Sequence, residues 1–169
     1  MSANGGGAWV GYAASQVPWK PSVFYRWSWF GGDDPETPAY ERFDPLLGGV
    51  QRAWLQGLVM VKMMNNANLV THRVEVSVKP RRGMDLALDM YFFRAQQGNN
   101  RGGSARPFQS FTSLDLGYEI SPTLQWSITP NVYIQALVST KVPGAGMAGQ
   151  LTGPAKTWTT FQLAVYAGL

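Results

Sequence analysis

The chain contains no cysteine, which excludes a disulfide framework, a thiolate metal site and a nucleophilic cysteine. Charged residues are only 14% of its 169 residues, well below the roughly 25% of a typical globular domain. No run approaches the ~18 consecutive apolar residues that predict a membrane-spanning helix. The first residues, "MSANGGGAWVG", lack the basic and apolar regions of a secretion signal, so we expect any export signal to be absent from this chain.

The net charge of +4 is too small, and the basic residues too scattered, to favour a nucleic-acid partner. Glycine and aromatic residues are plentiful instead, with 19 glycines and 13% aromatics. Such a composition is typical of strands and turns and not of surface helices. The sequence therefore predicts an all-β protein.

Apolar and polar residues alternate along seven segments, as they do in half-buried strands. In "LVTHRVEVSVKP", Val74, Val76 and Val78 fall on one face, and Arg73 and Glu75 fall on the other. The predicted strands cover residues 8–15, 22–29, 69–80, 84–93, 112–120, 124–139 and 159–169.

The expected connections alternate in length. Those at 16–20, 80–83 and 121–122 are short, whereas those at 31–66, 97–109 and 141–156 are long. Short turns at one end and long loops at the other, on strands of about ten residues, are typical of an antiparallel transmembrane up-and-down β-barrel. We therefore interpret residues 1–169 as one β-barrel segment with a long external loop at about 31–66.

Aromatic residues on the apolar face support a membrane position. Tyr118 and Trp126 flank the expected turn at 121–122, and Trp29 and Phe92 lie at the long-loop end of their strands. Barrels carry such aromatic girdles at both interfaces. The segment 50–68 does not fit the strand scheme, and we interpret it as part of the external loop, with a short helix or a strand folded over the barrel mouth.

The stretch "WKPSVFYRWSWFGGDDPETPAYERFDPL" resembles the alginate-export family of bacterial outer-membrane barrels. The later motifs follow in the same order as in that family: "VKP" at the end of one strand, "YFFRA" at the end of the next, then "LDLGYEISPTL". The resemblance covers nearly the whole chain.

The resemblance implies a barrel of about eighteen strands in the bacterial outer membrane, of which this chain would match the C-terminal third. Seven strands leave two unpaired edges, which lipid does not tolerate, and the number is odd where bacterial barrels are even. We therefore expect further strands, from upstream in the same gene or from other chains. The chain ends on Leu169, where outer-membrane barrels usually end on an aromatic residue.

The resemblance also implies a passive channel, without catalysis or cofactor, for an exported polysaccharide such as alginate or for another small polar or anionic solute. In the family, an electropositive lumen carries the uronate polymer. The charges expected on the inward face here are three basic and five acidic, so this segment alone is not electropositive: Arg26, Arg73, Glu75, Lys79, Asp85, Asp89, Asp115 and Glu119. They can pair across strands, as Arg73 with Asp89, or contact the solute, and the two roles are compatible.

Five acidic residues gather in the external loop: Asp33, Asp34, Glu36, Glu41 and Asp44. Their oxygens suit calcium, but the spacing is not that of a known calcium loop, and turn formation explains Asp33 and Asp34. His72 is the only histidine, and we expect no metal site from it.

Two other functions remain open. An outer-membrane barrel hydrolase would need a serine beside His72 on the lipid face. A soluble β-sandwich that binds carbohydrate would use Trp9, Trp54 or Trp158 as stacking platforms.

Overall fold

The computed structural model describes residues 3–44, 56–64, 66–100 and 108–168, and they form one antiparallel sheet of seven strands in sequence order. The strands are β1 (Gly5–Ala13), β2 (Ser22–Phe30), β3 (Leu69–Arg81), β4 (Met84–Ala95), β5 (Asp115–Thr129), β6 (Val132–Pro143) and β7 (Trp158–Ala167). Two short helices, α1 (Met60–Met63) and α2 (Ala145–Ala148), belong to the connections. The prediction of an all-β up-and-down sheet is confirmed.

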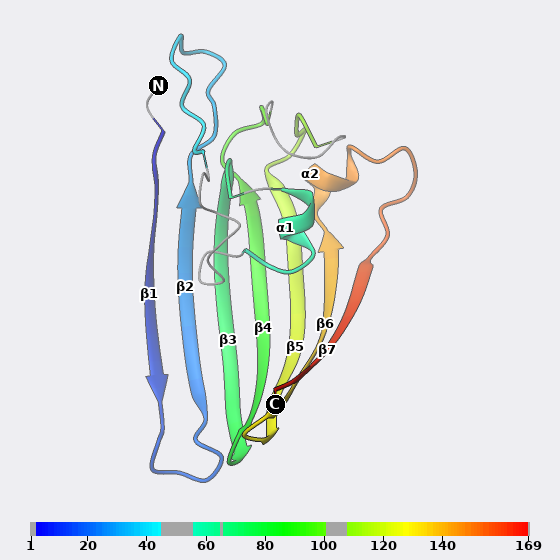
Figure 1. The fold of residues 1–169 in the computed structure, drawn as a ribbon. Helices are drawn as coiled ribbons and strands as arrows, with labels where there is room; N and C mark the ends of the chain where they lie inside the picture. Colours follow the sequence, from blue (N-terminus) through cyan, green and yellow to red (C-terminus); the bar gives the residue numbers. More distant parts are fainter. Residues whose placement is uncertain (1–2, 45–55, 65, 101–107, 169) are drawn as a thin grey trace.

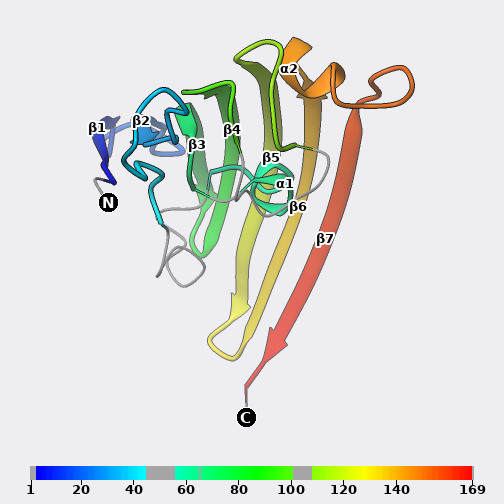
Figure 2. The same cartoon turned by 90° about the horizontal axis from the view of Figure 1, so that it is seen from above.

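The sheet is curved and open (Figure 1). Seen from above, it forms an arc with α1 on the inner side (Figure 2). We call this inner side the concave face and the opposite side the convex face. Within the described residues, β1 and β7 each pair with one neighbour only, so the sheet is not closed.

The connections alternate in length as predicted: short at 14–21, 82–83 and 130–131, long at 31–68, 96–114 and 144–157. We call the two ends of the sheet the short-turn end and the long-loop end. The expected turn at Ser121–Pro122 was wrong, because both residues lie inside β5, opposite Asp89 and Leu88 of β4.

The proline is tolerated because it interrupts hydrogen bonding on one side only. Proline has no backbone N–H to donate to the ladder, and neither Ser121 nor Pro122 is paired with β6. The hydroxyls of Ser121 and Ser139 hydrogen-bond at 2.8 Å across this gap. Tyr118 consequently belongs to the long-loop end, where its ring lies 6.4 Å from that of Phe92.

A β-bulge at the start of β5 reverses the predicted alternation. Phe93 lies opposite Gly117 and Arg94 opposite Asp115, which leaves Leu116 as the extra residue. Gly117 has φ +85, and a Cβ there would come within 2.1 Å of the Val142 carbonyl oxygen, so the bulge requires glycine. Leu116, predicted on the convex face, is instead fully buried on the concave side.

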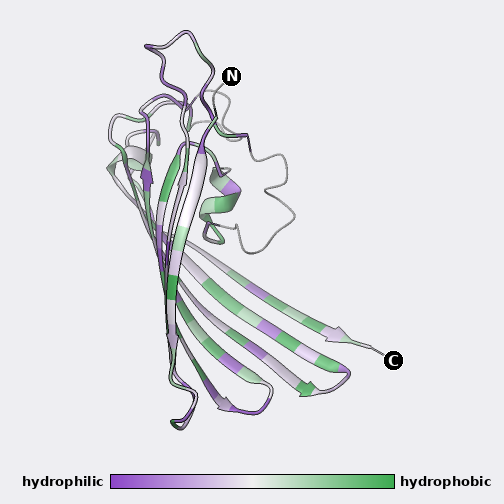
Figure 3. Ribbon diagram, turned by 90° about the vertical axis from the view of Figure 1, so that its left-hand side faces the viewer, coloured by the Kyte–Doolittle hydropathy of each residue, from purple (hydrophilic) through white to green (hydrophobic). Residues whose placement is uncertain are grey.

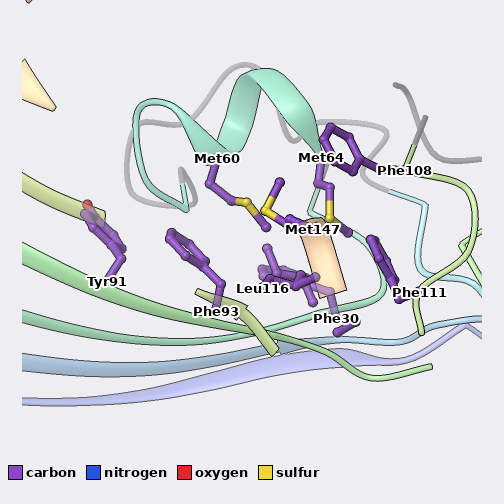
Figure 4. Packing of buried hydrophobic residues seen from close by; sticks show 11 residues of the cluster. Phe30, Met60, Met64, Tyr91, Phe93, Phe108, Phe111, Leu116 and Met147 are labelled. Atoms are coloured by element: carbon purple, nitrogen blue, oxygen red, sulfur yellow. The ribbon is translucent and has the colours of Figure 1, made fainter. Parts of the chain in front are cut away.

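The hydrophobic core lies on the concave side, towards the long-loop end, where α1 and α2 fold onto the sheet (Figure 4). Met60 of α1 and Met147 of α2 are fully buried there, beside Phe93 and Leu116. The predicted short helix within 50–68 is present, and it covers the inside of the sheet.

None of the helices in the described ranges is long and apolar enough to cross a membrane.

Candidate functional site on the concave face

A cluster of ion pairs occupies the middle of the concave face, on β3 and β4. Nε of Arg73 donates to Oδ1 of Asp89 at 2.6 Å, and its NH2 group contacts the Glu75 carboxylate. The Arg73 guanidinium also lies over the rings of Phe24 and Tyr91, 5.7 and 5.6 Å from their centroids. The predicted Arg73–Asp89 pair is therefore present, and the arginine is held from several sides.

A second ion pair lies nearer the short-turn end. Nζ of Lys79 is 2.8 Å from Oδ1 of Asp85. Both side chains are about half exposed, so we expect this pair to contribute little to stability. Arg26 shares the face and lies directly opposite Arg73.

The two groups of ion pairs line a concave cleft of about 1010 Å³ with Arg73, Glu75, Lys79, Asp85 and Asp89. Its other wall is neutral, with Gln125 of β5, Gln135 of β6 and Gln162 of β7 together with threonines and Leu137. Gln125 stands between Asp85 and Gln135 in the register, so the amide wall continues directly from the charged one. One end of the cleft is bounded by α1 and the residues before it, including Lys62.

Glu119 fastens α1 and the residues just before it to the sheet. Its buried carboxylate accepts the backbone N–H groups of Leu58, Val59 and Met60, the last at 2.9 Å. It also accepts the Ser139 hydroxyl at 2.6 Å. A carboxylate that accepts consecutive N–H groups satisfies donors that a helix start leaves free. Glu119 is thus a positioning residue for α1 and not a free wall charge.

Lys141 was missed by the sequence analysis, which placed it in a loop. It lies on β6 directly opposite Glu119 and is fully buried. Its Nζ donates to the Leu116 carbonyl oxygen and lies 4.8 Å from the centroid of the Phe93 ring. The alternation of β6 could have revealed it, since residues 135, 137, 139 and 141 share one face.

Asp115 does not join the concave group. The bulge places it opposite Arg94, towards the convex side, where it is exposed and accepts the Gly117 N–H at 2.9 Å. With Lys141 added and Asp115 removed, the concave strand faces carry four basic and four acidic residues: Arg26, Arg73, Lys79 and Lys141 against Glu75, Asp85, Asp89 and Glu119.

The acidic loop residues shape turns. Oδ1 of Asp34 accepts the Glu36 N–H at 3.0 Å, and Oδ1 of Asp33 accepts the Glu41 N–H at 3.0 Å. Asp44 is exposed. Across the part of the chain that the structure describes, no three histidine, aspartate or glutamate side chains are grouped to hold a metal ion.

Amide side chains join the long loops beneath this acidic stretch. Nδ2 of Asn68 donates to the carbonyl oxygen of Gln97 at 3.0 Å, and its Oδ1 accepts the Gln97 N–H at 2.8 Å. NH1 of Arg42 donates to Oδ1 of Asn100 at 3.0 Å. Arg42 is buried, and this burial lowers its pKa, although nearby acidic groups oppose the shift. The long loops at 31–68 and 96–114 are therefore tied to one another.

The convex face is apolar and uncovered. In the described strands it carries no charge between the level of Arg94 and the short turns. Leu88, in the middle of the sheet, is 38% exposed, and Val76 beside it is 42% exposed. Figure 3 shows the underlying alternation of hydrophilic and hydrophobic residues along the strands.

Aromatic side chains cross the convex face at one level of the ladder. Trp27, His72, Phe92 and Tyr118 lie opposite one another on successive strands. Nδ1 of His72 hydrogen-bonds the Tyr25 hydroxyl at 2.8 Å. No serine of the described strands shares this face, so the hydrolase hypothesis finds no nucleophile beside His72.

The tryptophans of the sandwich hypothesis are not gathered in one place. Trp9 lies on the edge strand β1 and is exposed, whereas Trp158 begins β7, opposite Lys141, and packs partly against the core. Trp54 lies outside the described residues. The described strands form a single sheet, so a sandwich would need a second one.

A scan against models of known protein families gave no match for this chain, and a search of curated proteins gave none either.

Proposed function

We propose that this chain is a segment of a bacterial outer-membrane β-barrel that resembles the alginate-export family and forms part of a passive channel. Its convex face would contact outer-membrane lipid, and its concave face would line a polar lumen. The remaining strands would come from upstream in the same gene or from other chains. The solute would be an exported polysaccharide, with anionic polymers included, or another small polar solute.

The observation that carries this proposal is the uncovered apolar convex face opposite a charged concave face. Large apolar side chains such as Val76, Leu88 and Ile120 stay more than one-third exposed in the middle of the sheet. Soluble monomers rarely expose a contiguous apolar surface of this extent, whereas lipid requires one. The charged residues in the middle of the strands alternate to the other side, as they do in a barrel lumen.

The length of the strands also supports a membrane-spanning sheet. The twelve residues of β4 span roughly 40 Å at about 3.4 Å per residue, or about 30 Å along the membrane normal at a tilt of about 40°. The shortest strands, β1 and β2, have 9 residues, within the usual range of about 9–11 for membrane strands. The level of Trp27, His72, Phe92 and Tyr118 would then mark the outer interface.

The test is to fractionate the source cells and blot the outer-membrane fraction, boiled and unboiled, with an antibody against β6 and β7. We expect a band that migrates faster unboiled, and discrete current steps when the purified protein enters a planar bilayer. An 18.6 kDa chain found in the soluble fraction, with no conductance, would contradict the proposal.

A further inference from the structure

Counted over the described residues, the lining of the cleft on the concave face has no net charge. Its lining holds three cations, Lys62, Arg73 and Lys79, and three anions, Glu75, Asp85 and Asp89. Arg73 and Lys79 are already paired with those three carboxylates. A wall of paired charges presents little net field to a passing ion, so charge does not decide what this surface binds.

The free hydrogen-bonding capacity of the cleft lies on its neutral wall. The side-chain amides of Gln125, Gln135 and Gln162 make no hydrogen bond within the described residues, and neither does the Thr160 hydroxyl. Each amide offers two N–H donors and one carbonyl acceptor. These three glutamines come from three adjacent strands, so their groups form a patch and not a line.

Such a patch matches a ligand with many hydroxyl groups. A sugar hydroxyl both donates and accepts, as an amide does, and neither partner has to give up a hydrated charge. An anionic group would find only Lys62 without an ion-pair partner in the described part of the cleft, and three carboxylates nearby.

We propose that this amide wall is a binding subsite for neutral, hydroxyl-rich solutes, that is, uncharged oligosaccharides. The inference rests on the proposed channel function and narrows its substrate class. Gln125, Gln135 and Gln162 contact the sugar hydroxyls. The cleft, about 1010 Å³, falls at the upper end of the usual range of about 300–1,000 Å³ for ligand pockets.

The experiment measures current block in planar bilayers with the whole purified protein, including the rest of its barrel. The probes are maltohexaose, which is neutral, and hexagalacturonate, an anionic oligomer of the same length. We expect maltohexaose to block the open channel at lower concentration than hexagalacturonate. In the variant Gln125→Leu/Gln135→Leu/Gln162→Leu, we expect the block by maltohexaose to weaken by about tenfold or more, because about three hydrogen bonds are lost.

The matched control is Gln109→Leu, the same change in an exposed loop outside the cleft, which should leave the block unchanged. If the triple variant does not assemble, the block by maltohexaose is measured in Gln125→Asn, Gln135→Asn and Gln162→Asn, one change at a time. Channels that hexagalacturonate blocks better, or a block unaffected by the glutamine changes, would overturn the subsite while leaving the channel intact. A protein that forms no channel at all would overturn both proposals.

Discussion

At the scale of single residues, a few polar side chains hold the loop segment that contains α1 against the concave face. Glu119 is the clearest case, because one carboxylate holds three backbone N–H groups of an inserted segment together with the Ser139 hydroxyl. It is fully buried. A buried ion is costly unless it is fully hydrogen-bonded, and the helix start supplies the bonds that offset this cost.

We expect Glu119→Gln to release α1 from the sheet, because the new amide turns N–H donors towards backbone N–H groups. Loss of these charge-assisted bonds should lower the local opening free energy by about 2 kcal/mol or more, which is roughly 30-fold faster exchange. Hydrogen–deuterium exchange of residues 56–64 measures the effect.

The control for this change is Glu75→Gln. It alters a carboxylate on the same face that pairs with Arg73 and makes no hydrogen bond to α1. Exchange in 56–64 should stay as in the parent protein. Equal exchange in both variants would mean that Glu119 does not anchor the segment.

At the scale of elements, the strand register decides which side chains meet. Thr123 of β5 lies directly opposite Leu137 of β6, with the turn at 130–131. A turn at 121–122 would instead have placed Ile120 near Thr123. Because the chain has no cysteine of its own, engineered pairs can separate the two registers cleanly.

We expect Thr123→Cys/Leu137→Cys to form a disulfide on mild oxidation, because directly opposite residues in antiparallel strands have Cβ atoms about 4.5–5.5 Å apart. Thr123→Cys/Ala136→Cys should not, since these side chains point to opposite faces. Non-reducing gels and peptide mass spectrometry give the result. A disulfide in Ile120→Cys/Thr123→Cys would instead show that the chain turns at 121–122.

Sequence alone predicted the strands where alternation was unbroken. Residues 69–80 and 84–93 match β3 and β4 closely, and with them the Arg73–Asp89 pair. The errors gather at β5, because proline usually ends a central strand and the bulge that Gly117 allows was not considered. That one bulge moved both Leu116 and Asp115 to unexpected faces.

The cleft itself was beyond sequence reasoning, because it depends on a loop folding inward. Nothing in the pattern of 56–64 shows that its backbone will meet Glu119, some 60 residues later. Lys141 was lost for a simpler reason, since the predicted strand was ended two residues before it. Long-range contacts of backbone with side chain leave no periodic signal.

At the scale of the whole molecule, the question is which medium covers the convex face. Leu88 and Ala87 are neighbours on β4 at the same depth, and they point to opposite faces. In water, both would tolerate a charge nearly equally, since surface substitutions usually change stability by less than about 0.5 kcal/mol. In the proposed barrel, Leu88 would face lipid and would not tolerate a charge, whereas Ala87 would face the lumen and would.

We expect Leu88→Arg to cost about 2–4 kcal/mol, the penalty for arginine at the lipid face near the bilayer middle. Ala87→Arg, which points into the cleft beside Asp85 and Asp89, should assemble normally. The readout is the amount of heat-modifiable protein in the outer-membrane fraction. Equal assembly of the two variants would mean that lipid does not contact this face.

The direction of the two edge strands restricts the symmetry of any closed assembly. Because every neighbouring pair is antiparallel, β1 and β7 both run from the long-loop end to the short-turn end. Rotation about the membrane normal preserves that direction, so β7 of one copy would meet β1 of the next in parallel. A ring of identical copies would carry a parallel seam at every junction. In a wholly antiparallel barrel, an odd number of further strands must therefore lie between β7 and the β1 that follows it.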